Sequence, residues 1–222
     1  MPRGVGAQHA DELRRLGDAA MRVVARGGLP SLTFRNAAAE AGVSPGRVQH
    51  YARTSNGLVA IAFRRVQERV AARVRAGLES LREPTPVEIV GSTLAALIPG
   101  DEEARVMLQV AAAVEVHALA DPDLADELRT GRRGLIDFLA EQLVLAAPRP
   151  APSARRDATA LLGFAEGLSS LVLTGTTAAD EARRLLRLAV RAATRAARVA
   201  GRLADGESGA AADTAPEVRE RR

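Results

Sequence analysis

Cysteine, lysine and tryptophan are absent from this 222-residue chain, and aromatic residues make up only 2% of it. Without cysteine, the chain can form neither a disulfide framework nor a thiolate metal site. Its three histidines, His9, His50 and His117, lie far apart, with no spacing typical of metal ligands. We therefore expect no bound metal ion and no cofactor.

Long apolar runs are also missing. No run approaches the roughly 18 apolar residues that a membrane-spanning helix needs, and the first twenty residues lack the apolar segment of a secretory signal. We therefore expect a soluble, cytoplasmic protein with no membrane partner.

Alanine, leucine and arginine are abundant instead. Hydrophobic residues make up 47% of the chain, and alanine and leucine are strong helix formers, which predicts an all-α protein. Residues 1–60 carry eight arginines against four acidic residues, whereas residues 85–222 carry seventeen against twenty. A basic N-terminal part on a slightly acidic body indicates a head that binds a polyanion.

Helical periodicity and capping signals predict about nine helices. A first helix stops at Gly27 and Gly28, and the next eight are expected over 34–41, 45–51, 55–82, 86–94, 102–119, 122–145, 154–173 and 177–203. A proline-rich link is expected over 148–153, and the polar segment 204–222 is expected to be disordered.

The stretch GVSPGRVQHY, residues 42–51, has too few apolar residues for a helix buried in a core. Ser44 suits the N-cap of a helix and Pro45 its first position, and after them only Val48 is clearly apolar. Together with the preceding helix and the turn at Gly42, this stretch fits a helix-turn-helix, whose second helix enters the major groove of DNA. A solvated surface helix is the other interpretation, and the spacing alone leaves both open.

In the helix-turn-helix interpretation, each exposed side chain has a partner on DNA. Arg47 can donate two hydrogen bonds to guanine, Gln49 can pair with adenine, and His50 and Tyr51 can bind phosphates or bases. The small residues Pro45 and Gly46 would let the backbone approach the groove closely. This pattern predicts double-stranded DNA as a partner.

Residues 13–62 resemble the N-terminal domain of the tetracycline-repressor (TetR) family. The matching features are a first helix ending in GG, then LTFR, AAAEAGVS, PGRVQHY and a helix opening at TSNGL. The resemblance implies DNA contacts at Thr33, Arg35, Thr54 and Ser55 besides those of the recognition helix. Ala52 stands where the family usually has phenylalanine, and Ser55 where it usually has lysine.

The C-terminal part resembles the choline-responsive repressors of the same family over 97–129 and 161–175. This resemblance implies a fold and not a ligand. Resemblance to the TetR family as a whole implies a small-molecule site in the C-terminal helices and a homodimer in which the last two helices of each chain form a four-helix bundle. One predicted seam of that bundle comprises Leu161, Ala165, Leu168 and Val172, and the other Leu185, Leu188, Ala192, Ala196 and Val199.

Apolar stripes on the fourth to seventh helices predict where an effector would bind. They comprise Ile61, Leu94, Met107, Val110, Val114, Leu135 and Phe138, with His117 and Gln142 as polar members. Each polar member is either a satisfied core residue or a polar handle in the pocket. We place no arginine on these stripes, so we expect a small apolar, uncharged or weakly polar effector.

Two other features of the sequence give little support to a further functional site. Six arginines on the last helix fit a solvated face better than a nucleic-acid or lipid site. Ser169 lacks the strand and second glycine of a nucleophile elbow, so we expect no enzyme activity.

Taken together, these features predict a ligand-responsive transcriptional regulator, most simply a repressor that binds a palindromic operator as a homodimer. The expected units are a DNA-binding domain over 1–54, a ligand-binding and dimerisation domain over 55–203, and the tail. The alternative is a helical carrier or enzyme that keeps the fold without binding specific DNA.

Overall fold

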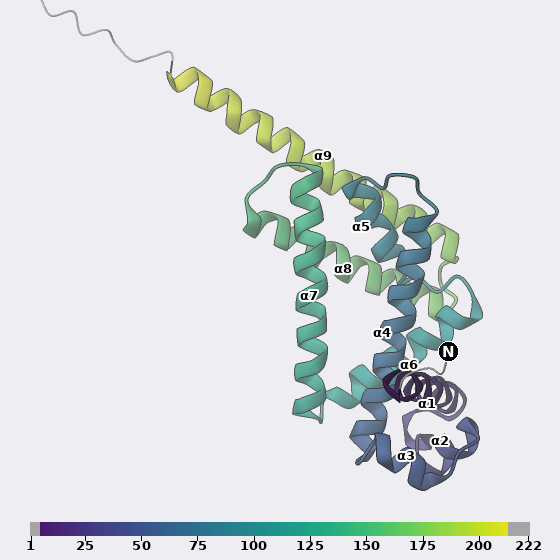
Figure 1. Ribbon diagram of the computed structural model, residues 1–222. Coiled ribbons are helices and arrows are strands. Elements are labelled where there is room, and N and C mark those ends of the chain that lie inside the picture. The colour runs from purple at the N-terminus through teal and green to yellow at the C-terminus, as the bar shows by residue number, and fades with distance from the viewer. Residues whose placement is uncertain (1–4, 213–222) are drawn as a thin grey trace, which may run out of the picture.

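The computed structural model describes residues 5–212, and within that range the chain forms nine α-helices, one short 3-10 helix and no strand (Figure 1). None of the described helices is long and apolar enough to cross a membrane. The all-α fold predicted from composition is confirmed. The elements are α1 (Val5–Gly27), η1 (Leu29–Ser31), α2 (Phe34–Ala41), α3 (Pro45–Tyr51), α4 (Ser55–Glu79), α5 (Pro86–Ala95), α6 (Glu102–Ala118), α7 (Pro122–Ala146), α8 (Ala151–Leu173) and α9 (Ala179–Ala212).

Local side-chain chemistry fixes the starts of the helices. The Thr33 hydroxyl accepts a hydrogen bond from the Asn36 amide at 3.1 Å, and Ser44 accepts one from the Arg47 amide at 3.3 Å. Thr85 and Glu88 form a complete capping box at the start of α5. Each cap satisfies backbone donors that the first turn leaves unpaired, so these predicted starts are confirmed.

Boundaries of α4, α8 and α9 differ from the sequence-based expectation. Helix α4 ends at Glu79, three residues before its predicted end, and α9 begins at Ala179 rather than at 177. Helix α9 continues to Ala212, nine residues past its predicted end, because 204–212 contain no proline and end in alanines. Helix α8 begins at Ala151, inside the predicted link, since Pro152 is tolerated in the first turn of a helix. The rest of the predicted tail, 213–222, lies outside the described residues.

The helices enclose two separate hydrophobic cores. The first core is formed by α1 to α4, α6 and the start of α7, and the second by α5, the rest of α7, α8 and α9. Figure 1 shows α1, α2 and α3 gathered at one end, with α4 leading away from them and α9 lying toward the opposite end. Because Leu58 to Val66 of α4 belong to the first core, this helix joins the N-terminal head to the body.

Candidate nucleic-acid interface and effector region

The head presents α3 on its surface. Ala37 and Ala38 of α2 are buried, as is Val48 of α3, so the two helices pack closely through small side chains. Gly42 ends α2 with a φ of 69°, a left-handed conformation that glycine adopts without strain. The tight turn and the buried Val48 turn the rest of α3 outward.

The residues predicted to contact DNA lie at the start of α2, along α3 and at the start of α4. Nine of them are exposed, and the tenth, Tyr51, is half-buried; the exposed ones are Thr33, Arg35, Pro45, Gly46, Arg47, Gln49, His50, Thr54 and Ser55. The hydroxyls of Thr33 and Thr54 also cap α2 and α4, at 3.1 and 3.0 Å from the amides they accept. The arrangement offers cationic and hydrogen-bonding groups on consecutive surface segments.

Glu12 of α1 ties two of these side chains together, which the sequence-based reasoning missed. Arg47 donates to the Glu12 carboxylate from Nε at 3.0 Å and also from Nη2, and the Tyr51 hydroxyl donates to the same carboxylate. The Arg47 guanidinium lies 5.6 Å from the centre of the Tyr51 ring. The centre of the His9 ring lies 4.9 Å from the centre of the same tyrosine ring. Glu12 is 35 residues from Arg47, so no local pattern could reveal the contact.

These hydrogen bonds shift the protonation equilibria of the cluster. The bonds from Arg47 and then from Tyr51 lower the pKa of Glu12, so the carboxylate stays ionised. The same bond to Glu12 raises the pKa of Arg47 and that of Tyr51. The cluster is therefore an ion pair with a neutral phenol hydrogen-bonded to it.

Other arginines of the head differ in whether they are already paired. Arg26 and Arg22 both donate to Glu40, whose pKa these bonds lower to about 2. Arg35 and Arg53 are exposed and form no ion pair with any residue in the described part of the chain. These two side chains are free to meet phosphates.

Ala52, one of the two positions at which the sequence departs from the family pattern, is fully buried at the end of α3. It lies in the first core with Leu58 and Phe63. The small side chain is therefore accommodated inside this core.

The predicted effector residues are divided between the two cores. Ile61, Met107, Val110 and Val114 are buried in the first core, whereas Leu94 is buried in the second and Leu135 packs against it. Phe138 is 39% exposed and Gln142 is half-buried.

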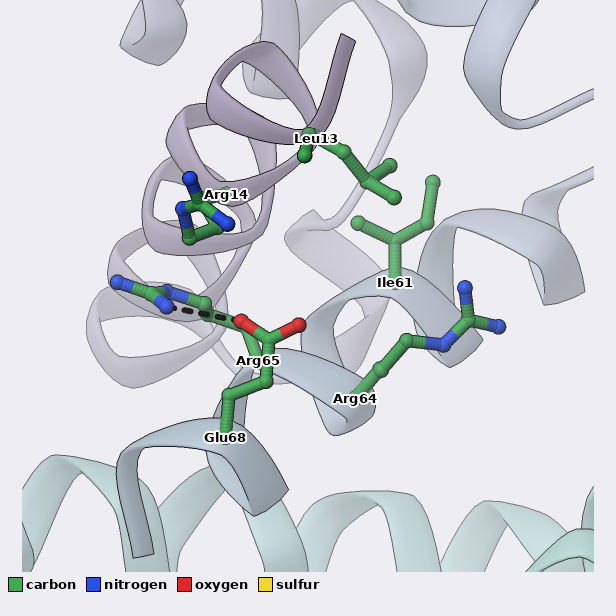
Figure 2. A pocket seen from close by; sticks show the side chains of 7 residues that line it. Leu13, Arg14, Ile61, Arg64, Arg65 and Glu68 are labelled. Carbon is green, nitrogen blue, oxygen red and sulfur yellow. Dashed lines mark hydrogen bonds and ion pairs between the residues drawn. The ribbon is translucent and has the colours of Figure 1, made fainter. Parts of the chain in front are cut away.

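Ile61 also lines a small cavity of about 70 Å³ between α1 and α4, where it faces Leu13 (Figure 2). Three arginines and Glu68 surround this cavity, and Arg65 pairs with Glu68 at 2.9 Å. Its volume is well below the roughly 300 Å³ of a typical small-molecule site. The cavity is therefore a packing defect of the head.

His117 lies at the junction between α6 and the head. It is half-buried, and its Nε2 lies 3.3 Å from Oδ1 of Asn56. The Nδ2 group of the same asparagine donates a hydrogen bond to the Asp121 carboxylate. Asp121 also accepts from the amides of Asp123 and Leu124, at 3.1 and 3.2 Å, and so caps α7. This chain of hydrogen bonds links the start of α4 to the turn between α6 and α7.

The expectation that no arginine falls on the inward stripes is wrong. Arg132 lies one turn after Leu128 on α7 and pairs with Glu115 of α6 at 2.6 Å and with Glu166 of α8 at 3.2 Å. Burial raises the pKa of Glu115, against the opposing effect of Arg132. The prediction considered only the apolar residues of the stripe, so it missed an arginine whose charge is balanced by carboxylates on other helices.

The two predicted dimer seams lie in different environments. Leu161, Ala165, Leu168 and Val172 of α8 are buried in the second core of their own protomer, because this face of α8 packs on α7 and α9. Leu185, Leu188, Ala192, Ala196 and Val199 of α9 are exposed. On α8 the exposed apolar stripe is instead Ala160, Gly163, Phe164, Gly167 and Leu171.

The described residues of the six-arginine stripe on α9 are all exposed. Arg184 pairs with Glu181 one turn earlier, and Arg198 donates to the carbonyl of Ala146 at 3.0 Å. This solvated stripe runs beside the exposed apolar stripe of α9.

Comparison with known proteins gives one consistent set of relatives. A family model described as the C-terminal part of BetI-type transcriptional repressors matches residues 86–195. The chain is 31% identical to the HTH-type transcriptional regulator PksA of Bacillus subtilis (strain 168) over 149 residues, which span 65% of this chain and 71% of that protein.

Solved structures agree with this result. A transcriptional regulator from Rhodococcus sp. Rha1 superposes with a TM-score of 0.73 at 26% identity, over 84% of this chain and 97% of that one. The multidrug binding protein EbrR, complexed with proflavin, superposes with a TM-score of 0.53 at 27% identity, over 80% of this chain and 99% of that one.

Proposed function

Because the chain belongs to the TetR family of transcriptional regulators, we propose that it is a ligand-responsive repressor that binds a palindromic operator as a homodimer. The observation that carries this proposal is the exposed α3, capped by Ser44 and anchored by the buried Val48, with Arg47, Gln49 and His50 on its surface. A short helix with this anchoring and these side chains suits the major groove. Action on chromosomal DNA would place the protein in the cytoplasm.

Phosphate contacts would come from the flanks of α3. Arg35 at the start of α2 and Arg53 before α4 are exposed and unpaired within the described residues. The N-cap hydroxyls of Thr33 and Thr54 and the side chain of Ser55 lie on the same two segments. Contacts of this kind position the protein on DNA, whereas the α3 side chains read the bases.

A homodimer follows from the exposed apolar stripes of α8 and α9. Phe164, Leu171 and Leu188 are 41%, 42% and 62% exposed. The space above Gly163 and Gly167 is open, so a partner helix can approach the α8 backbone closely. Two copies joined through these stripes would present two recognition helices to the two halves of a palindrome.

We propose that the effector binds between the two cores, where α4, α6, α7 and α8 meet. The group Glu115, Arg132 and Glu166 joins α6, α7 and α8 there and has a net charge of −1. A largely apolar molecule suits these surroundings, and an anionic one would meet an unbalanced carboxylate. The similar protein EbrR is a multidrug binding protein whose structure was solved in complex with proflavin.

Helix α4 would transmit the effect of ligand binding to the DNA-binding head. This helix begins beside α3, and its side chains Arg69 and Arg73 pair with Glu103 and Asp101 at the start of α6. A shift of α6 on ligand binding would therefore move the head and change the separation of the two recognition helices.

The test is selection of duplexes from a random pool by the full chain, followed by titration of the selected and a scrambled duplex over a range of salt. We expect an enriched inverted repeat, tighter binding of the selected duplex and a steep loss of affinity with salt. Folded protein that enriches no sequence would contradict the proposal.

A further inference from the structure

A carboxylate lies among the side chains that are proposed to meet DNA. Glu12 is 33% exposed, and it accepts hydrogen bonds from both Arg47 and Tyr51. Arg47 and Tyr51 are one turn apart on α3, so both side chains reach α1 from the same side of the recognition helix. A negative charge at this place opposes a polyanion, so it needs a compensating role.

The geometry of the pair shows which donors of Arg47 remain free. A guanidinium carries five N–H donors, and Glu12 takes the one on Nε and one on Nη2. Both donors on Nη1 and the second donor on Nη2 stay available. Guanine needs two donors for O6 and N7, so the paired Arg47 can still read guanine through its terminal edge.

Pairing with Glu12 leaves donors of Arg47 free but cancels its charge. As long as Glu12 is bound to it, the pair has no net charge, so it adds little to the attraction of DNA phosphates. The ring of Tyr51, 5.6 Å from the guanidinium, further limits where Arg47 can turn. A phosphate would meet the same free donors on a pair that has no net charge and would gain little from it, whereas guanine needs only the two directed donors.

We propose that Glu12 is a specificity-determining positioning residue for DNA recognition. It holds the Nε edge of Arg47 and the hydroxyl of Tyr51 against α1, and it cancels the charge through which Arg47 would bind any phosphate. The recognition helix then gains energy from Arg47 only where a base accepts the terminal edge. This role rests on the proposed function of α3 as the helix that enters the major groove.

The test is Glu12→Gln, which keeps the side-chain length and one hydrogen-bond acceptor but removes the charge. The affinity for a mixed-sequence duplex should rise about three- to tenfold, because Arg47 gains a phosphate contact. The slope of log affinity against log salt should steepen by about 0.9 for each protomer bound, and so by about 1.8 for the homodimer. The ratio of affinities for the selected and the mixed duplex should fall.

Two matched variants separate this role from net charge and from folding. Glu181→Gln removes the same charge from a carboxylate that pairs with Arg184 on α9, away from α3, and it should leave the slope unchanged. Glu12→Asp keeps the charge and should return the slope toward that of the wild type. In an Arg47→Ala background, Glu12→Gln should have no effect on the salt slope, because Glu12 acts through Arg47.

The outcomes are distinct. An unchanged salt slope in a folded Glu12→Gln variant, or an equal change in Glu181→Gln, would overturn the role of Glu12 and leave the proposed function intact. Wild-type protein that is folded and binds neither duplex at low salt would overturn the proposed function, and with it the role of Glu12. Thermal unfolding of each variant shows which of them is folded.

Discussion

Both cores are apolar inside, but the first has more ion pairs between its helices than the second. In the first, the Asp18 carboxylate accepts hydrogen bonds from Arg65 at 2.6 Å and Arg69 at 3.0 Å, and Arg73 of α4 reaches Asp101 at 2.7 Å. The second core is a layer of leucine, valine and alanine, with Arg149 buried at its edge against Asp157. Directional ion pairs fix one orientation of α1, α4 and α6, whereas apolar packing has no such preference.

This difference suits two tasks. The head must hold α3 in a fixed orientation relative to α6, and ion pairs between α1, α4 and α6 do this. The second core leaves apolar stripes of α8 and α9 exposed, so the same non-directional packing can continue into a second copy. The following variants test this division, in order of decreasing expected effect.

Leu168→Arg should have the largest effect, because Leu168 is only 4% exposed within the second core. An unpaired charge there costs about 3–5 kcal/mol or more, a large share of the stability of a typical domain. We expect loss of cooperative unfolding in thermal melts followed by circular dichroism. A stable variant that merely dissociates would show that this face of α8 points to a partner.

Leu188→Arg is the matched change on the exposed stripe of α9, where the side chain is 62% exposed. The protomer should keep its helical content, whereas a charge in the seam should weaken the dimer by on the order of a hundredfold. Sedimentation velocity measures this, and operator affinity should fall with it, since a monomer holds one half-site. An intact dimer would exclude this stripe from the interface.

Arg47→Ala tests the surface of the head rather than its core. Loss of the guanine contact should weaken operator binding by about 1–3 kcal/mol and relax the preference at one base pair in each half-site. Titration of operator variants changed at single positions gives both values. Unchanged affinity and preference would remove Arg47 from the recognition surface.

Asp18→Asn tests the ion pairs of the first core and should cost about 1–3 kcal/mol at neutral pH. Burial raises the pKa of Asp18, but the bonds from Arg65 and Arg69 outweigh it, so the pKa lies below its ordinary value. The folded state therefore favours the charged carboxylate, and this stabilisation is present above the ordinary pKa of about 3.9 and lost as the pH falls through and below it.

The measurement is the urea unfolding midpoint from pH 6 to pH 3. The wild type should lose stability over the acid end of this range, and Asp18→Asn should lose less. Parallel curves for the two proteins would show that Asp18 contributes nothing to the acid sensitivity of the head.

Glu115→Gln should have the smallest effect and the opposite sign. Burial raises the pKa of Glu115, so the folded state favours its neutral form, and the charged form costs stability once the pH exceeds the ordinary pKa. Removing the charge should raise stability at pH 7 by less than about 1 kcal/mol, because the side chain is 44% exposed and solvent screens it. Calorimetry at pH 7 checks the sign, and a clear destabilisation would contradict it.

Within the candidate site, prediction from sequence succeeded where the interactions are local. The caps at Thr33 and Ser44 act within three residues, so the sequence reveals the start of α2 and α3 and the outward position of Gln49 and His50. It failed at Arg132, because whether an arginine on an inward stripe is tolerated depends on Glu115 and Glu166 from other helices.

The face of α8 shows the same limit. The helix carries two apolar stripes, one through Leu161 and Leu168 and the other through Phe164 and Leu171, and periodicity gives both the same weight. Only the packing of α7 and α9 decides that the first stripe is internal.

By itself, the sequence determined the all-α fold, the starts of α2 to α7 and the helix-turn-helix, because capping, helix propensity and glycine turns act between residues a few positions apart. The tertiary structure alone decided that Arg47 and Tyr51 share the carboxylate of Glu12, that the start of α4 is joined to α7 through Asn56 and Asp121, and which stripe of α8 remains exposed. Each of these depends on side chains that are 35 or more residues apart in sequence or on the packing of whole helices, and such distances are set only when the two cores have formed.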